Sequence, residues 1–431
     1  MYQKKLLLIT LFLLILASFF GCEPLATNNQ VKTATYSKPI NMNKESKVNK
    51  STTIESIKES RDSTQEKNLE IGLLLPLSGQ NYRIGRSLLN AAQLALDKTQ
   101  QNNINFKIID TNDEKKFLTD LYSLIEEDIN FVIGPVFTSK VMQVRDILNE
   151  KNIPIISLSN NSILEKNKLF VFGLTLEDEI NRLLIYSSHK NLENYSVVIP
   201  RNEYGYRVKE EIEKFRSQHN SLVFKFIFYD TNAPDFYALS KAISNYEERR
   251  MNLENEIKIL ENENSEQANK KLKRLKKMDT YGDLDFQAIM IFTQNYEELS
   301  NISSILPYYD VDPKKIQFMG NSVWSNNSSL KEPGLQNGFF TFTNMKNKRQ
   351  FENEYIKVFN TNPHSLSSLT YDLVGLIGKL HNKNNLFEVE QLFNEFGFIG
   401  IDGWFQFQKS GKVLRKPDIY EIKNQKFILV K

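Results

Sequence analysis

The stretch Ile71-Gly-Leu-Leu-Leu-Pro-Leu-Ser-Gly79 decides the expected fold. It opens with a continuous apolar run, which is typical of a strand buried on both faces, and it closes with a proline- and glycine-containing turn. The pattern then changes period, because Ile84, Leu88 and Ala92 recur at the spacing of a helix. A buried strand followed at once by an amphipathic helix predicts the first unit of a parallel sheet covered by helices.

The same alternation of strand and helix patterns continues along the chain. Further strands are expected at residues 104–109, 131–134, 153–158, 196–199, 222–229, 287–292 and 316–319. Helices are expected at 84–96, 114–128, 139–151, 177–190, 204–218, from 296 onward, and at 346–359 and 366–381. This succession predicts an α/β fold whose parallel sheets have helices on both faces.

The pattern restarts after Gly173, which predicts two αβα lobes joined by crossover strands. We expect residues 69–175 and 320–396 to form lobe 1, and residues 176–319 and 397–431 to form lobe 2. A chain that passes between two lobes has its cleft at the crossings, and ligands of open parallel sheets bind beyond the carboxyl ends of the strands.

Residues 240–280 do not fit a compact αβ unit, and we expect them to form a helical hairpin inserted in lobe 2. Acids dominate the first half of this polar segment, and bases dominate the tract Lys270–Lys277. A break at Asn262-Glu-Asn-Ser265 predicts two antiparallel helices, with opposite charges facing across a thin apolar seam. The basic tract could bind acidic lipid or nucleic acid. We expect a solvated, salt-bridged face instead, with docking to a partner protein as the alternative.

The first residues indicate secretion. Two lysines precede the apolar run Leu6–Phe20, which has the layout of a signal peptide and is short for a membrane span. A glycine and Cys22 close this run in a way that resembles a bacterial lipobox. Residues 1–22 are therefore expected to be a lipoprotein signal peptide with Cys22 lipidated, and the alternative is an uncleaved signal anchor. Residues 23–68 are polar and almost free of aromatic residues, which predicts a disordered tether.

The composition excludes several classes of function. A net charge of +3 over 431 residues argues neither for a nucleic-acid binder nor for an acidic solvating protein, and we expect no nucleic-acid partner. The single cysteine cannot form an internal disulfide. The four histidines lie in no metal-binding spacing, and neither a Walker loop, a GxGxxG motif nor a nucleophile elbow occurs. We therefore expect no catalytic activity, no metal and no cofactor.

Several stretches resemble type I solute-binding proteins of the leucine-binding kind. They are Ile71–Gly79, Ile133-Gly-Pro135, Ile155-Ile-Ser157, Asn202-Glu-Tyr-Gly205 and the closing hairpin from Gly397 to Gly403 with Phe405, Phe407 and Gly411. A narrower resemblance is to the penicillin-binding protein activator lipoproteins of alphaproteobacterial type. It adds the helical insert, Asp285-Phe-Gln-Ala288, Leu306–Asp312, Gly320-Asn-Ser-Val-Trp324 and Leu369-Thr-Tyr-Asp372. The resemblance covers residues 69–431 and implies a two-lobed type I periplasmic-binding-protein fold.

The resemblance also implies where a ligand would bind. In the solute-binding relatives, hydroxyl groups and backbone N–H groups hold a carboxylate, and an acidic side chain holds the amine. The corresponding cleft positions here are Ser78, Thr138, Ser139, Asn160, Asn161 and Tyr204, and Trp324 is expected to pack over the cleft or to plug it. The alternative is that Ser78, Thr138 and Asn161 are helix caps and turn residues and that Trp324 is a core residue. No carboxylate lies in Gly320–Trp324, which weakens an amino-acid receptor function.

The resemblance implies a non-catalytic periplasmic lipoprotein that binds and activates a peptidoglycan synthase of the penicillin-binding class. Its lipid would hold it at the periplasmic face of the outer membrane, with the inner membrane as the alternative. The rival function is a receptor for an amino acid, a peptide or a wall fragment, serving a transporter or sensor. A third hypothesis combines both, with a wall fragment in the cleft gating the docking. An open, polar cleft would favour a receptor, and an apolar, filled cleft would favour a scaffold.

Overall fold

The structure is a computed structural model that describes residues 40–41, 68–100, 103–263, 265–381 and 387–430. All of these belong to one compact unit, residues 39–431. Cys22, the expected signal peptide and nearly all of the expected tether lie outside the described residues. The elements confirm the predicted α/β fold class with parallel sheets.

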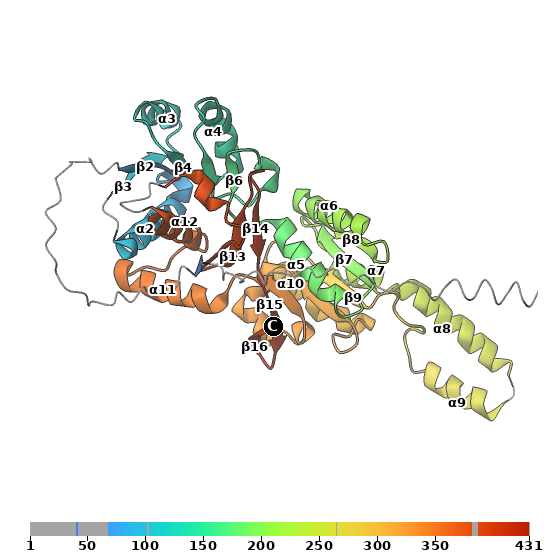
Figure 1. The fold of residues 1–431 in the computed structure, drawn as a ribbon. Helices are drawn as coiled ribbons and strands as arrows, with labels where there is room; N and C mark the ends of the chain where they lie inside the picture. Colours follow the sequence, from blue (N-terminus) through green and yellow to red (C-terminus); the bar gives the residue numbers. More distant parts are fainter. Residues whose placement is uncertain (1–39, 42–67, 101–102, 264, 382–386, 431) are drawn as a thin grey trace, which may run out of the picture. The chain divides into compact units, whose positions relative to one another are not determined.

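The first sheet has five parallel strands in the order β3-β2-β4-β5-β6 (Figure 1). They are β2 (Leu69–Leu75), β3 (Ile104–Asp110), β4 (Phe131–Ile133), β5 (Ile155–Ser157) and β6 (Leu169–Val171). Strand β2, which carries the apolar run, pairs with β3 on one side and β4 on the other. Because helices also cover both faces, residues 71–75 are buried, as the run predicted.

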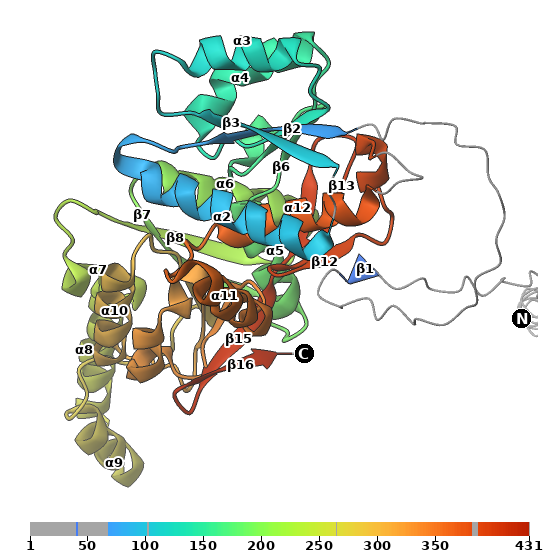
Figure 2. The same cartoon turned by 90° about the vertical axis from the view of Figure 1, so that its left-hand side faces the viewer.

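Helices cover the two faces of the first sheet (Figure 2). Helices α2 (Tyr82–Thr99) and α12 (Ser367–Leu380) pack on one face, and α3 (Phe117–Glu126) and α4 (Thr138–Glu150) pack on the other. Alternate residues of β2 point to opposite faces, so Leu73 joins the α2–α12 core and Leu74 joins the α3–α4 core. Helix α11 (Met345–Phe359) packs against α2.

The second sheet has seven strands in the order β16-β15-β11-β10-β9-β7-β8. They are β7 (Asn194–Pro200), β8 (Val223–Tyr229), β9 (Ala288–Ile291), β10 (Gln317–Gly320), β11 (Phe339–Phe342), β15 (Asp418–Lys423) and β16 (Lys426–Val430). The first five pair in parallel, whereas β15 and β16 add an antiparallel edge. Helices α5 (Leu176–Ser188) and α6 (Glu203–Gln218) cover one face, and α7 (Phe236–Ile243) and α10 (Tyr296–Ile305) cover the other.

A small third sheet packs against the first lobe. Its order is β1-β12-β13-β14, with β1 (Ile40–Asn41), β12 (Phe398–Gly400), β13 (Gly403–Phe407) and β14 (Val413–Lys416). Alternate aromatic residues of β13 enter the first-lobe core, where Phe405 meets Phe172 edge-on at 5.0 Å between ring centroids. Short 3-10 helices complete the fold: η1 (Gly79–Asn81), η2 (Ser162–Leu164), η3 (Leu306–Tyr309), η4 (Ser322–Ser325), η5 (Asn327–Lys331), η6 (Pro333–Leu335) and η7 (Val389–Leu392).

The strand pairing differs from the expected lobe boundaries in two places. Residues from 320 to 342 belong with the second lobe, because β11 pairs in parallel with β10, which pairs with β9. Residues 398–416 pack on the first lobe, and only β15 and β16 return to the second sheet. The local pattern of a strand does not state which neighbour it pairs with, so the boundaries at 320 and 397 were misplaced.

Two helices, α8 (Tyr246–Glu261) and α9 (Glu266–Leu275), extend away from the second sheet (Figures 1 and 2). They pack through a narrow seam that includes Leu253, Leu260, Ala268 and Leu275. Ser265 caps α9 by accepting the N–H of Ala268 at 3.0 Å. Among the described residues, no helix combines the length and the apolar character needed to cross a membrane.

Candidate functional site

A buried carboxyl, Glu179, lies at the start of the second lobe. The chain leaves β6 and begins α5 at once, because Thr175 and Asp178 form a capping box at the helix start. Glu179 in the first turn is only 8% exposed. Its Oε1 accepts a hydrogen bond from the backbone N–H of Ser322 at 3.3 Å, across 143 residues of sequence.

Three further polar groups gather beyond the carboxyl ends of the second-sheet strands. Asn321, directly after β10, donates from Nδ2 to the Tyr204 hydroxyl and to the backbone carbonyl of Thr293, both at 2.8 Å. Tyr204 comes from the first turn of α6, which follows β7, and Thr293 follows β9. Asn321 Oδ1 and Thr293 Oγ1 are buried and have no protein partner. Parallel strands therefore bring these groups to the edge where such sheets bind ligands.

The electrostatics of this edge favour a hydrogen-bond donor from outside. Burial raises the pKa of Glu179 to about 7, although the Ser322 contacts oppose the shift. Burial and the nearby Glu179 carboxyl also raise the pKa of Tyr204. Among the described residues, no lysine or arginine forms an ion pair with Glu179. A cationic or N–H-donating group that reached this edge would meet the Glu179 carboxyl and two acceptor oxygens without a protein partner.

The polar residues expected in the first lobe fall at the carboxyl edge of its sheet, mostly with structural contacts. Thr138, at the start of α4, lies 3.3 Å from Ser159 between hydroxyl oxygens. Asn161 caps η2 by accepting the N–H of Ile163 at 3.3 Å, which is the alternative considered from the sequence. Ser139 and Asn160 are exposed.

Ser78 contributes to the turn after β2. Burial alone would raise the pKa of Asp110, but hydrogen bonds from the Ser78 side chain and from backbone N–H groups of Asn112 and Leu77 lower it. The Ser78 carbonyl accepts from Asn112 Nδ2 at 2.8 Å. Ser78 is thus tied to the turn and to Asp110.

Trp324 belongs to the core of the second lobe. It is completely buried, and its Nε1 donates to the carbonyl of Ile291 at 3.3 Å. Gly320 and Gly338 make room for the indole, because a Cβ at either position would lie within 2.6 Å of it. Trp324 is therefore a core residue, which is the alternative considered from the sequence, and its ring does not plug a cleft.

The structure therefore brings together only some of the residues that were expected to line the cleft. Tyr204 is brought to Asn321, whereas Glu179, Asn321 and Thr293 were not expected at all. The segment Gly320–Trp324 contains no carboxylate, but the fold supplies one from a helix far earlier in the chain. The capping pattern Thr175-Leu-Glu-Asp178 could have marked the helix start, but nothing local indicated that the next residue faces Ser322.

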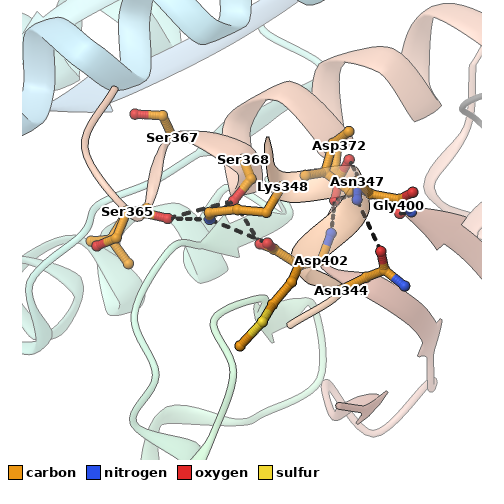
Figure 3. Close-up of polar contacts among 12 residues, drawn as sticks. Asn344, Asn347, Lys348, Ser365, Ser367, Ser368, Asp372, Gly400 and Asp402 are labelled. Carbon is orange, nitrogen blue, oxygen red and sulfur yellow. Dashed lines mark hydrogen bonds and ion pairs between the residues drawn. The ribbon is translucent and has the colours of Figure 1, made fainter. Parts of the chain in front are cut away.

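A second buried polar cluster lies where α11, α12 and the third sheet meet (Figure 3). Asp372 accepts the N–H of Ile401 with both carboxyl oxygens, at 2.8 and 2.9 Å. Asp402 accepts from the Ser368 hydroxyl at 2.7 Å and from Lys348 Nζ at 3.2 Å. Burial, with Asp402 close by, raises the pKa of Asp372 to about 7.

Arg415 connects this cluster to the lobe crossings. Its Nε donates to the carbonyl of Phe172 at 2.8 Å, and its backbone N–H donates to Asp178 Oδ1 at 3.2 Å. The guanidinium also lies 4.2 Å above the Phe172 ring. Burial lowers its pKa, and the neighbouring carboxyls of Asp402, Asp372 and Asp178 oppose that shift. At another crossing, Asn344 Nδ2 donates to Asp418 at 2.9 Å.

The parallel first sheet and the mainly parallel second sheet, joined by crossing segments, define a two-lobed protein with the type I periplasmic-binding-protein fold. A solved structure of a putative branched-chain amino acid ABC transporter from Rhodospirillum rubrum has a TM-score of 0.63 and 14% identity, covering 84% of this chain and 100% of that one. The C-domain of LpoA from Haemophilus influenzae, described as a regulator of PBP1A, has a TM-score of 0.60 and 16% identity over 84% of this chain and 100% of that one. Full-length LpoA has the same TM-score and identity, covering 85% of this chain and 60% of that one. At such identities the likeness is one of fold.

The family is shown by the sequence match. The model of the LppC putative lipoprotein family matches residues 51–333, so the chain belongs to the LppC family. The uncharacterized protein RP748 of Rickettsia prowazekii (strain Madrid E) is 25% identical over 183 residues, which are 42% of this chain and 48% of that protein. The match thus spans about half the length of this relative.

Proposed function

We propose that this LppC-family chain is a non-catalytic lipoprotein that binds a peptidoglycan synthase of the penicillin-binding class and raises its activity. The observation that carries the proposal is the shared architecture with the LpoA C-domain, which is matched over its whole length by 84% of this chain. That domain is described as a regulator of PBP1A. Membership of a lipoprotein family is consistent with a partner embedded in a membrane.

The proposal includes a place for the chain. Lipid on Cys22 would hold it at the periplasmic face of the outer membrane. Residues 23–68 would act as the tether, apart from Ile40 and Asn41, which pair with β12. A chain with Cys22→Ser should leave the membrane fraction yet still bind the synthase in solution. Retention of this variant in the membrane would contradict anchoring through Cys22.

The test of the main proposal is reconstitution with the purified synthase. We expect the lipidated chain to bind it at micromolar concentration or tighter and to raise its glycan polymerisation or cross-linking rate several-fold. Heat-denatured chain is the control. Native chain that neither binds the synthase nor changes either rate would contradict the proposal.

The cluster around Glu179 favours a second candidate, a receptor for a small ligand with an ammonium group. A thermal-shift screen against amino acids, short peptides and muropeptides tests it. A ligand at one hundred times its dissociation constant should stabilise the native state by about 2.7 kcal/mol. Glu179→Gln should abolish the shift, whereas the matched control Glu210→Gln, at an exposed carboxyl on α6, should retain it. No shift with any ligand of these classes would contradict the receptor function.

A further inference from the structure

The hairpin formed by α8 and α9 is fastened to the second lobe at its base. Arg249, 8% exposed, donates to the carbonyl of Gly282 and to Asp310, both at 3.0 Å. Thr280, on the returning chain, donates to the same Asp310 carboxyl at 2.7 Å. Both ends of the hairpin are thus bonded to Asp310, the residue that follows η3, so the base of the hairpin has a fixed attachment to the second lobe.

Ion pairs and apolar contacts inside the hairpin determine which face of α9 remains outside. Lys271 pairs with Glu256 at 2.5 Å, and Lys276 pairs with Glu261 at 2.7 Å. Leu275 is fully buried and Leu272 is partly buried in the same seam. These contacts use the apolar residues of α9 and two of its bases, so this side of the helix faces α8.

The opposite side of α9 is a basic face, which we define as Lys270, Lys273, Arg274 and Lys277. Lys270, Lys273 and Arg274 lie at i, i+3 and i+4 on one side of α9, Lys277 follows in the turn after the helix, and all four are exposed. Lys270 pairs with Glu266 of its own helix at 3.0 Å. Across the described parts of the chain, no acidic side chain forms an ion pair with the other three.

We propose that this basic face is a docking surface for an acidic surface of the synthase. The proposal rests on the proposed function and specifies the element and the chemistry of contact. A cluster of exposed cations, three of which form no ion pair among the described residues, complements a carboxylate-rich protein surface and increases the rate of encounter with it. An anionic lipid surface fits less well, because the apolar side of α9 faces α8 and cannot insert into a membrane. The fixed attachment of the hairpin at its base also favours a protein contact of defined orientation, whereas adsorption to lipid requires no such orientation.

The experiment compares two charge-matched variants of the lipidated full chain. The first carries Lys273→Glu, Arg274→Glu and Lys277→Glu. The control carries Lys115→Glu, Lys151→Glu and Lys357→Glu, three exposed lysines of the first lobe that also lie at or near helix ends. Binding to the immobilised synthase is measured at two salt concentrations. The Kd of the first variant should rise at least about tenfold and lose most of its salt dependence, and the control should stay within about twofold.

The outcomes separate this inference from the proposed function. Wild-type chain that binds while the α9 variant binds equally well overturns the inference and leaves the proposed function standing. Wild-type chain that does not bind the synthase overturns both. Vesicles containing phosphatidylglycerol are the second probe, and they are used with chains that also carry Cys22→Ser, so that no acyl chain holds the protein to the vesicle. Loss of vesicle binding with synthase binding intact assigns the face to lipid and overturns the inference. If the variant with three glutamates is poorly folded, the test uses a neutral double variant, Lys273→Ala and Arg274→Ala. This double variant should show an intermediate loss of synthase binding.

Discussion

Gly400 approaches Asp372 so closely that no side chain fits between them (Figure 3). A Cβ on Gly400 would lie 2.2 Å from Asp372 Oδ2, whereas a Cβ on Gly375 in the same helix as Asp372 meets nothing within 4 Å. Gly400→Ala should therefore lower the free energy of unfolding by about 2–3 kcal/mol. Gly375→Ala should leave it unchanged or raise it by up to about 1 kcal/mol, because alanine favours the helix. Urea denaturation measures both, and equal effects would contradict the crowding at Gly400.

Glu179 predicts a pH dependence at the same scale. Its pKa is raised from 4.5 to about 7 in the folded protein. Between these values the folded state holds a proton that the unfolded state has released, so the contribution to stability is complete below about pH 4.5 and is lost as pH rises through 7. The loss is about 3 kcal/mol at most.

Glu179→Gln keeps an oxygen for the Ser322 N–H but cannot ionise. The variant should lose less stability than the wild type between pH 5 and 8, as measured by urea denaturation at several pH values. Glu210→Gln, at an exposed carboxyl on α6, is the control and should follow the wild type. A Glu179→Gln profile that also follows the wild type would contradict the buried carboxyl.

At the scale of elements, the attachment of the hairpin to the second lobe depends on Arg249. Arg249→Met removes its bonds to Gly282 and Asp310, and it should cost about 1–2 kcal/mol, because Asp310 is half exposed and regains water. Faster hydrogen exchange and faster proteolysis confined to α8 and α9 are expected. Arg250→Met removes only an exposed i, i+4 pair with Glu254 and should cost less than about 0.5 kcal/mol. Unchanged exchange in the Arg249 variant would mean that the seam alone holds the hairpin.

Elements also show how far the sequence can be read. The buried strand β2 and the helix after it could be predicted, because the apolar period of a segment follows from its own residues. The lobe to which β11 belongs could not be predicted. Its four residues indicate only a strand, and the strand with which it pairs lies about twenty residues earlier. Trp324 likewise has a place in the core only because Gly320 and Gly338 leave space for its ring.

At the scale of the whole molecule, Arg415 links the first crossing, near Phe172 and Asp178, with the last crossing after β14. Arg415→Met would leave Asp178, Asp372 and Asp402 without this buried cation, which should cost about 3–5 kcal/mol at pH 8. The cost should shrink at pH 5, because burial and the neighbouring Asp402 raise the pKa of Asp372, so this carboxyl carries less negative charge at the lower pH. The neighbouring Lys416→Met removes only a cation 4.5 Å above the Trp404 ring and should cost about 1 kcal/mol or less. Urea denaturation at both pH values measures these losses in the free energy of unfolding. An equal loss at pH 5 and pH 8 for the Arg415 variant would contradict an interaction between Arg415 and these carboxyls.

The sequence by itself determined the α/β class, the order of most strands and helices and the two-lobed fold, because these follow from local apolar period and from recognisable motifs. Only the tertiary structure decided where the carboxyl near Asn321 comes from, which lobe holds residues 320–342 and 398–416, and which side of α9 is exposed. These features depend on burial and on contacts between segments far apart in the chain. A carboxyl such as Glu179 acquires its raised pKa from surroundings that its neighbours in sequence do not provide.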